Sequence, residues 1–458
     1  MKRSFKLAIV TLLLAAAAVA QTTTAPAPGP AKPFKVPTRH QFMLPNGLTA
    51  NLIPYGTIPK AQISIIVRAG DLNASADQIW LPELTTDLLR EGTASKTAEQ
   101  VDAAFARMGG RLFVNAGDDT TTISADVLSD HAAEAAKLLA EVAMSPRLPE
   151  SELARLKNDR LRNLAIARTQ PGTLAAERFA SVLYGDHPYG RSFPTEAMLK
   201  GFTIDDVRKF YADNFGAQRT RVYVAGKFDT TAVEQAIRTS FASWAKGPEP
   251  VINVPKSNAT RRLELVEKPN AVQSTLNIGL PTADPSQKDY IPLLVTNTLL
   301  GGSFISRITQ NIRENKGYTY SPFSRIGTHY REANWAEIAD VTTAVTGPSL
   351  KEIFGEIEGL RKAPPSADEL QRIQRYMSGV FVLNNSSRGG IIGQMAFVDF
   401  HGLGDDYLRT YVQKVNAVTP EEVHRIAEQY LDPAKMLIVV VGDKEKIAEQ
   451  IAPYGKAD

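Results

Sequence analysis

A long internal repeat constrains the fold of this chain more than any other feature of its sequence. Residues 202–209 match residues 418–425, and residues 221–226 match residues 437–442. Both pairs lie 216 residues apart, because 419 − 203 and 442 − 226 both give 216. Nearer the start of each half the offset is 211, as between Gln62 and Gln273. A near-constant offset over this span predicts two homologous domains rather than a solenoid, whose repeats are far shorter.

Strand-like and helix-like segments alternate within the first repeat. We expect strands over residues 40–44, 48–53, 62–69, 111–116, 121–127 and 220–225. We expect helices over residues 80–91, 97–108, 131–144, 150–167, 173–183 and 203–210. This interleaving predicts the α+β class, in which the helices of each domain pack on a mostly antiparallel sheet.

A turn-rich segment separates the two repeats. Residues 246–262 are rich in Pro, Gly, Ser and Asn, which is typical of a linker. We therefore expect an N-terminal domain over residues 38–245 and a C-terminal domain over residues 263–458. The net charge of +3 is small for 458 residues and argues against a dedicated nucleic-acid or membrane-surface binder.

The N-terminus has the pattern of a targeting segment. Lys2, Arg3 and Lys6 precede an apolar stretch over residues 7–17, and small residues follow up to residue 20. This pattern predicts a signal peptide over residues 1–20 and an exported protein, with a bacterial periplasm as the expected location. An uncleaved anchor is the alternative. The chain has no Cys and hence no lipoprotein acylation site, and residues 21–37 are expected to form a disordered linker.

The helix expected over residues 80–91 is the centre of the first repeat. Four leucines, at positions 81, 84, 88 and 89, form one apolar stripe, and Gly92 is a helix stop. Glu83, Thr86 and Asp87 lie on the same helix, and the residues alone favour a solvated polar face for the two acids. A weak site for a hard cation at Glu83 and Asp87 is the alternative.

Three segments carry a resemblance to a known family. They are the helix tail over residues 89–93, the Leu-Tyr-Gly-Asp-His-Pro-Tyr-Gly run over residues 183–190, and residues 300–321. Together with the tandem repeat, these segments resemble the pitrilysin/insulinase family of zinc peptidases. The two-domain bacterial subunits of that family, and the subunits of the mitochondrial processing peptidase, are the most similar branch.

The resemblance implies a metal site whose ligands are substituted in this chain. The family places an inverted His-x-x-Glu-His motif just before the helix tail. Its three positions fall on Glu83, Thr86 and Asp87, and its third ligand falls near Leu164. None is the residue type the family uses. Thr86 stands where the family has its general base, and a hydroxyl without an adjacent base cannot deprotonate water near neutral pH. We therefore expect no zinc on this chain.

The second half keeps residues that bind substrate in the family. The resemblance implies that Arg313 and Tyr320 bind the peptide backbone and stabilise the developing oxyanion. It also implies that Gly301 and Gly302 form a flexible wall of the substrate chamber. From spacing alone, Arg313 would pair with an acid on its own helix and Tyr320 would pack in a strand.

These expectations combine into one interpretation with two alternatives. The chain is expected to be a non-catalytic, pseudopeptidase subunit of a heteromeric zinc peptidase. A paralogue with an intact His-x-x-Glu-His motif would be its partner and would hold the zinc. This chain would bind the peptide substrate and complete the active site of that partner in trans. One alternative is a metallopeptidase active on its own through a non-standard metal site. The other is a non-catalytic scaffold or binding protein.

Overall fold

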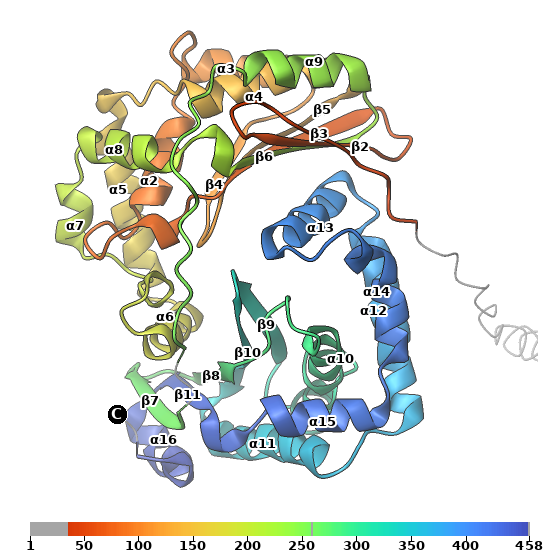
Figure 1. The fold of residues 1–458 in the computed structure, drawn as a ribbon. Helices are drawn as coiled ribbons and strands as arrows, with labels where there is room; N and C mark the ends of the chain where they lie inside the picture. Colours follow the sequence, from red (N-terminus) through yellow and green to blue (C-terminus); the bar gives the residue numbers. More distant parts are fainter. Residues whose placement is uncertain (1–34, 258–259, 457–458) are drawn as a thin grey trace, which may run out of the picture. The chain divides into compact units, whose positions relative to one another are not determined.

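The computed structural model describes residues 35–257 and 260–456 (Figure 1). The signal peptide expected over residues 1–20, and nearly all of the linker expected over residues 21–37, lie outside the described residues. In the described part of the chain, no helix is long and apolar enough to cross a membrane.

The first half of the described chain builds a six-stranded mixed sheet, here called sheet 1. Its spatial order is β1-β2-β6-β3-β5-β4, and only the β2–β6 pair is parallel. The strands are β1 (His40–Met43), β2 (Thr49–Pro54), β3 (Lys60–Val67), β4 (Phe113–Ala116), β5 (Thr121–Leu128) and β6 (Thr220–Gly226). The expected strands are all present, and their ends shift by at most two residues.

The second half builds a five-stranded sheet, here called sheet 2, on the same plan. Its order is β7-β11-β8-β10-β9, with β7 and β11 parallel. Its strands are β7 (Arg262–Glu267), β8 (Gln273–Pro281), β9 (Phe323–His329), β10 (Glu332–Thr342) and β11 (Leu437–Gly442). Each strand of sheet 2 has a counterpart in sheet 1, so the sequence repeat is also a structural repeat.

The helices of the two halves correspond as well. The first half contains α2 (Leu81–Leu89), α3 (Ala98–Arg107), α4 (Ala132–Met144), α5 (Glu150–Ala167), α6 (Pro171–Tyr184), α7 (Glu196–Gly201), α8 (Ile204–Asn214) and α9 (Thr230–Ser240). The second contains α10 (Tyr290–Leu300), α11 (Thr346–Lys362), α12 (Ala367–Asn384), α13 (Arg388–His401), α14 (Asp406–Ala417), α15 (Pro420–Tyr430) and α16 (Lys444–Ile451). Helix α12 starts 217 residues after α5, and α13 starts 217 residues after α6 (367 − 150; 388 − 171).

Each half lends one helix to the sheet of the other half. Helix α6 of the first half packs on β7, β8 and β11 of sheet 2, and α13 of the second half packs on β3 and β6 of sheet 1. Alternation along β11 shows why both faces must be covered: Val439 and Val441 join the cluster that contains α6, whereas Ile438 and Val440 face the opposite core. The two halves are therefore packed into each other.

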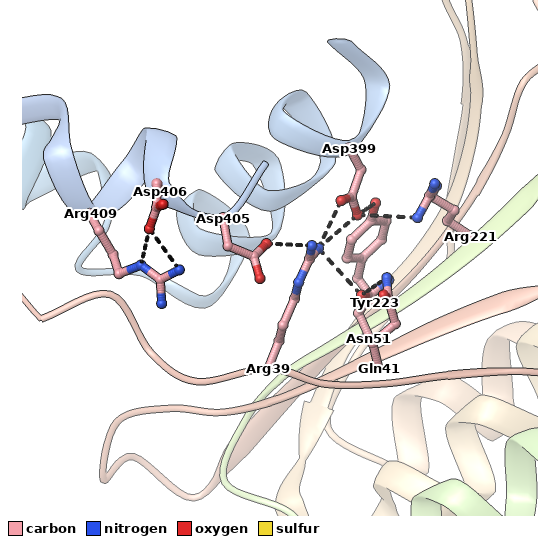
Figure 2. A network of polar contacts seen from close by, with 9 residues as sticks. All are labelled: Arg39, Gln41, Asn51, Arg221, Tyr223, Asp399, Asp405, Asp406 and Arg409. Atoms are coloured by element: carbon pink, nitrogen blue, oxygen red, sulfur yellow. Dashed lines mark hydrogen bonds and ion pairs between the residues drawn. The ribbon is translucent and has the colours of Figure 1, made fainter. Parts of the chain in front are cut away.

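Polar contacts also hold α13 on sheet 1. Asp399 of α13 accepts from Arg39 Nη1 at 2.8 and 2.9 Å and from the hydroxyl of Tyr223 at 2.7 Å, as Figure 2 shows. Arg39 also donates to Asp405 at 2.6 Å, just beyond the end of the helix. Where α6 packs on sheet 2, Arg178 of α6 pairs with the buried Glu264 of β7.

Candidate functional site

Helix α2 forms where the leucine stripe predicts it. Leu81, Leu84, Leu88 and Leu89 are all fully buried. Pro82 lies in the first turn, where its missing N–H costs no hydrogen bond. Gly92 has a φ of +104° just after the helix, and a Cβ there would lie 2.5 Å from the carbonyl oxygen of Lys96, so the chain needs glycine to leave the helix here.

The positions that align with the metal motif contact an arginine. Arg160 of α5 donates from Nε to Asp87 Oδ2 at 2.7 Å and from Nη2 to the carbonyl oxygen of Glu83 at 3.0 Å. Thr86 is buried, and its hydroxyl donates to the same Glu83 carbonyl at 2.8 Å. The expectation of a solvated polar face is therefore wrong. The guanidinium of Arg160 covers the turn of α2 on which the family places its ligands.

Leu164 lies on α5 one turn after Arg160. It is 1% exposed and belongs to the main apolar core of the first half. A carboxylate at this position would be buried among leucines. The third-ligand position is therefore part of the hydrophobic packing between α5 and α2, whose contact the structure confirms.

The donors around α2 do not fit a zinc ion. Zinc sites in proteins use imidazole, thiolate or carboxylate ligands, with three of them from protein in a catalytic site. No three His, Asp or Glu side chains in the described part of the chain converge as a metal site. Burial raises the pKa of Glu83, and burial together with the neighbouring Glu83 raises the pKa of Asp71. The oxygens Glu83 Oε2 and Asp71 Oδ1 are both buried, and no donor among the described residues reaches them.

Arg313 and Tyr320 are brought together by the fold. Arg313 lies on the π-helical segment η5 (Thr309–Asn315), and its guanidinium stacks 4.4 Å from the ring centroid of Phe304 and 4.8 Å from that of Tyr320. Its Nε lies 3.3 Å from the carboxylate of Glu314. Tyr320 is 78% exposed, so it does not pack in a strand as spacing alone suggested. No hydrogen bond or ion pair joins either residue to α2 in the described part of the chain.

Gly301 and Gly302 are required by close packing. A Cβ on Gly301 would lie 2.5 Å from Glu337 Oε2 and 2.6 Å from Ser324 Oγ, and a Cβ on Gly302 would lie 2.5 Å from Asn297 Nδ2. Glu337 is fully buried in β10, and its burial raises its pKa. The glycine pair therefore lets the end of α10 pass over a buried carboxyl.

The Leu-Tyr-Gly-Asp-His-Pro-Tyr-Gly run joins the two halves through its rings. Tyr189 stacks on His329 of β9 with ring centroids 3.8 Å apart, and the Tyr184 ring meets the same imidazole edge-on at 5.8 Å. The Tyr184 hydroxyl donates to Glu332 at 2.9 Å and accepts from Asn334 at 2.8 Å. Sequence reasoning missed these three second-half partners, because they follow no motif and lie about 140 to 150 residues away.

A cavity of about 510 Å³ adjoins this contact between the halves. Its wall includes Arg68, Arg219 and Arg221 from the ends of β3 and β6, His329 from β9, and Phe400 from α13. Sequence reasoning did not single out these arginines or Arg160.

Comparison with known proteins identifies the family. The description "Insulinase (Peptidase family M16)" matches residues 53–195, and "Peptidase M16 inactive domain" matches residues 201–377. The chain is 24% identical over 393 residues to the uncharacterized zinc protease YmxG of Bacillus subtilis, covering 85% of this chain and 95% of that one. It is 22% identical over 422 residues to the uncharacterized zinc protease SCO5738 of Streptomyces coelicolor, covering 90% and 92%.

Solved structures show the same two-domain fold. A peptidase M16 inactive domain from Pseudomonas fluorescens superposes with a TM-score of 0.80 at 24% identity, covering 88% of this chain and 98% of that one. A protease from Helicobacter pylori superposes with a TM-score of 0.82 at 20% identity, covering 89% and 100%. With both family descriptions matched in the order of the two halves, the chain belongs to the insulinase family of peptidases, family M16.

Proposed function

We propose that this chain is the non-catalytic subunit of an exported, heteromeric peptidase of family M16. The observation that carries the proposal is the contact of Arg160 with Asp87 and with the Glu83 carbonyl on helix α2. The guanidinium of Arg160 pairs with Asp87, the acid at the motif position, and Thr86 provides no general base. Hydrolysis would then need a paralogue that carries an intact His-x-x-Glu-His motif and holds the zinc.

The pair Arg313 and Tyr320 supports a role in the partner's reaction. A guanidinium and a phenol can both donate hydrogen bonds to a peptide carbonyl oxygen as negative charge develops on it. The two flanking rings hold the Arg313 guanidinium in place, and the exposed Tyr320 is available to a second molecule. An exposed tyrosine stacked on an arginine contributes little to the core, which favours a binding role over a structural one.

Two free sheet edges offer places for an extended peptide. One of the two edge strands of sheet 1 is β4, which contacts α2, and one of the two edge strands of sheet 2 is β9. Edge strands present unpaired backbone N–H and C=O groups, and peptides bind them by adding a strand. We propose that substrate peptides bind in this way and that both subunits contact them.

The test compares variants in the reconstituted complex. The chain is co-purified with a paralogue that has the intact motif, and cleavage of a fluorogenic peptide is measured for the wild type, R313A and Y320F. Loss of an oxyanion donor is expected to lower turnover by roughly 10²–10³-fold. Co-elution and the melting temperature should stay unchanged. R375A and Y376F on α12 are matched controls and should retain full turnover.

Other outcomes would identify the alternatives. Full turnover by R313A and Y320F in an intact complex would contradict the trans role and favour a scaffold. Chelator-sensitive cleavage by the chain alone, with about one zinc bound per chain, would favour a peptidase with its own metal site. Export is tested separately, by periplasmic extraction of cells that express the full chain. Retention in the cytoplasmic fraction would contradict it.

A further inference from the structure

The cavity between the two halves contains two arginines, Arg68 and Arg219, that form no ion pair with a carboxylate among the described residues. The backbone N–H of Arg68 donates to the carbonyl oxygen of Arg219 at 2.8 Å, which places the two residues side by side at the ends of β3 and β6. Both line the cavity. The guanidinium of Arg68 lies over the rings of Tyr330 and Phe400, at 4.8 and 5.3 Å, and makes no hydrogen bond or ion pair in the described part of the chain.

Arg219 is buried, and three of its five N–H donors, those on Nε and Nη2, have no acceptor among the described residues. It is 2% exposed, and only its Nη1 has acceptors, the carbonyl oxygen of Asp213 and Asn214 Oδ1, both at 3.4 Å. Both Nε and Nη2 are buried, so Arg219 acts on an anion in the cavity through its charge. Burial lowers the pKa of Arg219, and the neighbouring Arg68 lowers it further.

The acids in the cavity wall already have other partners. Asp399 is held by Arg39 and the Tyr223 hydroxyl, as Figure 2 shows. Asp119 accepts from the hydroxyl of Tyr189 at 2.6 Å and lies 3.6 Å from His329 Nδ1. Asp118 lies 3.5 Å from the same imidazole nitrogen. Arg221 is 3.5 Å from Asp399, so among the described residues it is the one cavity arginine with a carboxylate within ion-pair distance.

We propose that this cavity binds a carboxylate group of the substrate peptide, with Arg68 as its donor and Arg219 as a second positive charge. The inference rests on the proposed peptide-binding function and adds a preference for acidic groups. The half-buried Arg68 has no acceptor for its guanidinium among the described residues, and the buried Arg219 has acceptors on Nη1 alone. Removing a guanidinium from water without an acceptor is costly, and an anion in the cavity that accepts from Arg68 offsets that cost. The rings of Phe397 and Phe400 provide an apolar wall for the rest of the bound residue. The carboxylate can come from a peptide C-terminus or from an Asp or Glu side chain.

Binding to the full chain without a partner tests the inference. One eight-residue peptide is prepared in three forms: with a free C-terminus, as the C-terminal amide, and as the amide with one internal Glu. Affinities are measured by fluorescence anisotropy for the wild type, R68Q and R68K. Because hydrogen bonds to charged groups contribute strongly to affinity, R68Q should bind the preferred acidic form of the peptide roughly 10- to 100-fold more weakly than the wild type. R68K should recover part of the loss, and the fully neutral amide should bind all three proteins alike.

Controls separate this inference from the proposed function. R238Q removes a guanidinium that stacks on Phe42 outside the cavity and should bind like the wild type. Equal affinity of R68Q and the wild type for every peptide, or preference of the wild type for the neutral amide, would overturn the carboxylate site. Those results would leave an R313A effect in the complex standing. Selective loss in R68Q without any activity of the complex would support the site and overturn the subunit role.

Discussion

Arg160 and Asp87 lie 73 residues apart in sequence, and their contact joins α5 to α2. The two side chains are only 18% and 23% exposed, so solvent screens the pair less than it would screen a surface ion pair. Because Nη2 also donates to the Glu83 carbonyl, the guanidinium satisfies two acceptors on adjacent turns. Arg160 therefore pairs with the acid at the motif position and also stabilises the packing of α5 on α2.

R160M is expected to destabilise the chain. Methionine keeps most of the apolar stem but leaves the Asp87 carboxylate and the Glu83 carbonyl without their donor, at an expected cost of about 1–3 kcal/mol. Urea unfolding of R160M and wild type at pH 7 measures this cost. R155M on the same helix is the control: Arg155 is 52% exposed, and the loss of its ion pairs should change stability by about 0.5 kcal/mol or less. Equal midpoints for R160M and R155M would show that the Arg160 contact is not stabilising.

At the scale of elements, the turn between β9 and β10 is one of the places where the second half meets the first. His329 ends β9 and contacts the rings of Tyr184 and Tyr189, and Glu332 begins β10 and accepts from the Tyr184 hydroxyl. Burial raises the pKa of Glu332 to about 7, although the Tyr184 hydroxyl and His329 oppose the shift. The pKa of His329 is also raised: burial opposes the charged form, but Asp119 and Asp118 favour it more strongly. Of this contact, the carboxyl of Glu332 is therefore the group whose pKa lies near neutrality.

E332Q is expected to flatten the pH dependence of stability. A carboxyl whose pKa is raised by folding stabilises the fold below its unfolded pKa of 4.5, and this contribution is lost as pH rises through about 7. Glutamine stays neutral and can still accept from Tyr184. Denaturant midpoints at pH 5, 6, 7 and 8 should fall less steeply for E332Q than for the wild type. His329 should leave a residual slope of the same sign. E134Q, at an exposed acid, should keep the wild-type slope, and an unchanged slope for E332Q would contradict the shifted pKa.

The sequence predicts separate elements better than it predicts their contacts. The leucine stripe placed α2 within two residues of its observed start, and the family resemblance of residues 300–321 led to the pair Arg313 and Tyr320, which the structure brings together. Local patterns carry no information on which side chain of α5 faces α2, so Arg160 was missed. Local sequence also does not explain Gly301. The sequence around it indicates a loop, but glycine is needed because the buried Glu337 lies too close for a Cβ. Glu337 comes from β10, which starts 31 residues later (332 − 301).

At the scale of the whole molecule, the repeat predicts two sheets but not the exchange of helices between them. A repeat fixes which segments are equivalent, and it does not say whether α6 covers its own sheet or the other. Helix α6 packs on sheet 2 through Phe179 and Ala175, in one cluster with Val439 and Val441. Helix α13 packs on sheet 1 at the displaced position. Each sheet is therefore incomplete on one face without the other half, which makes the two halves mutually dependent for burial.

This dependence predicts that the two halves stay associated after the connection is cut. A protease site inserted after the exposed Val254 separates the halves between α9 and β7. The cleaved pieces should co-elute on size exclusion, because burial of the apolar faces under α6 and α13 continues to favour the complex. F179D places a charge in the buried face of α6 and should release the pieces after cleavage. I166D, at a position on α5 that is 59% exposed, should not. Separate, folded pieces from the cleaved wild-type chain would show that each half completes its own core, and would contradict the reciprocal packing as a source of stability.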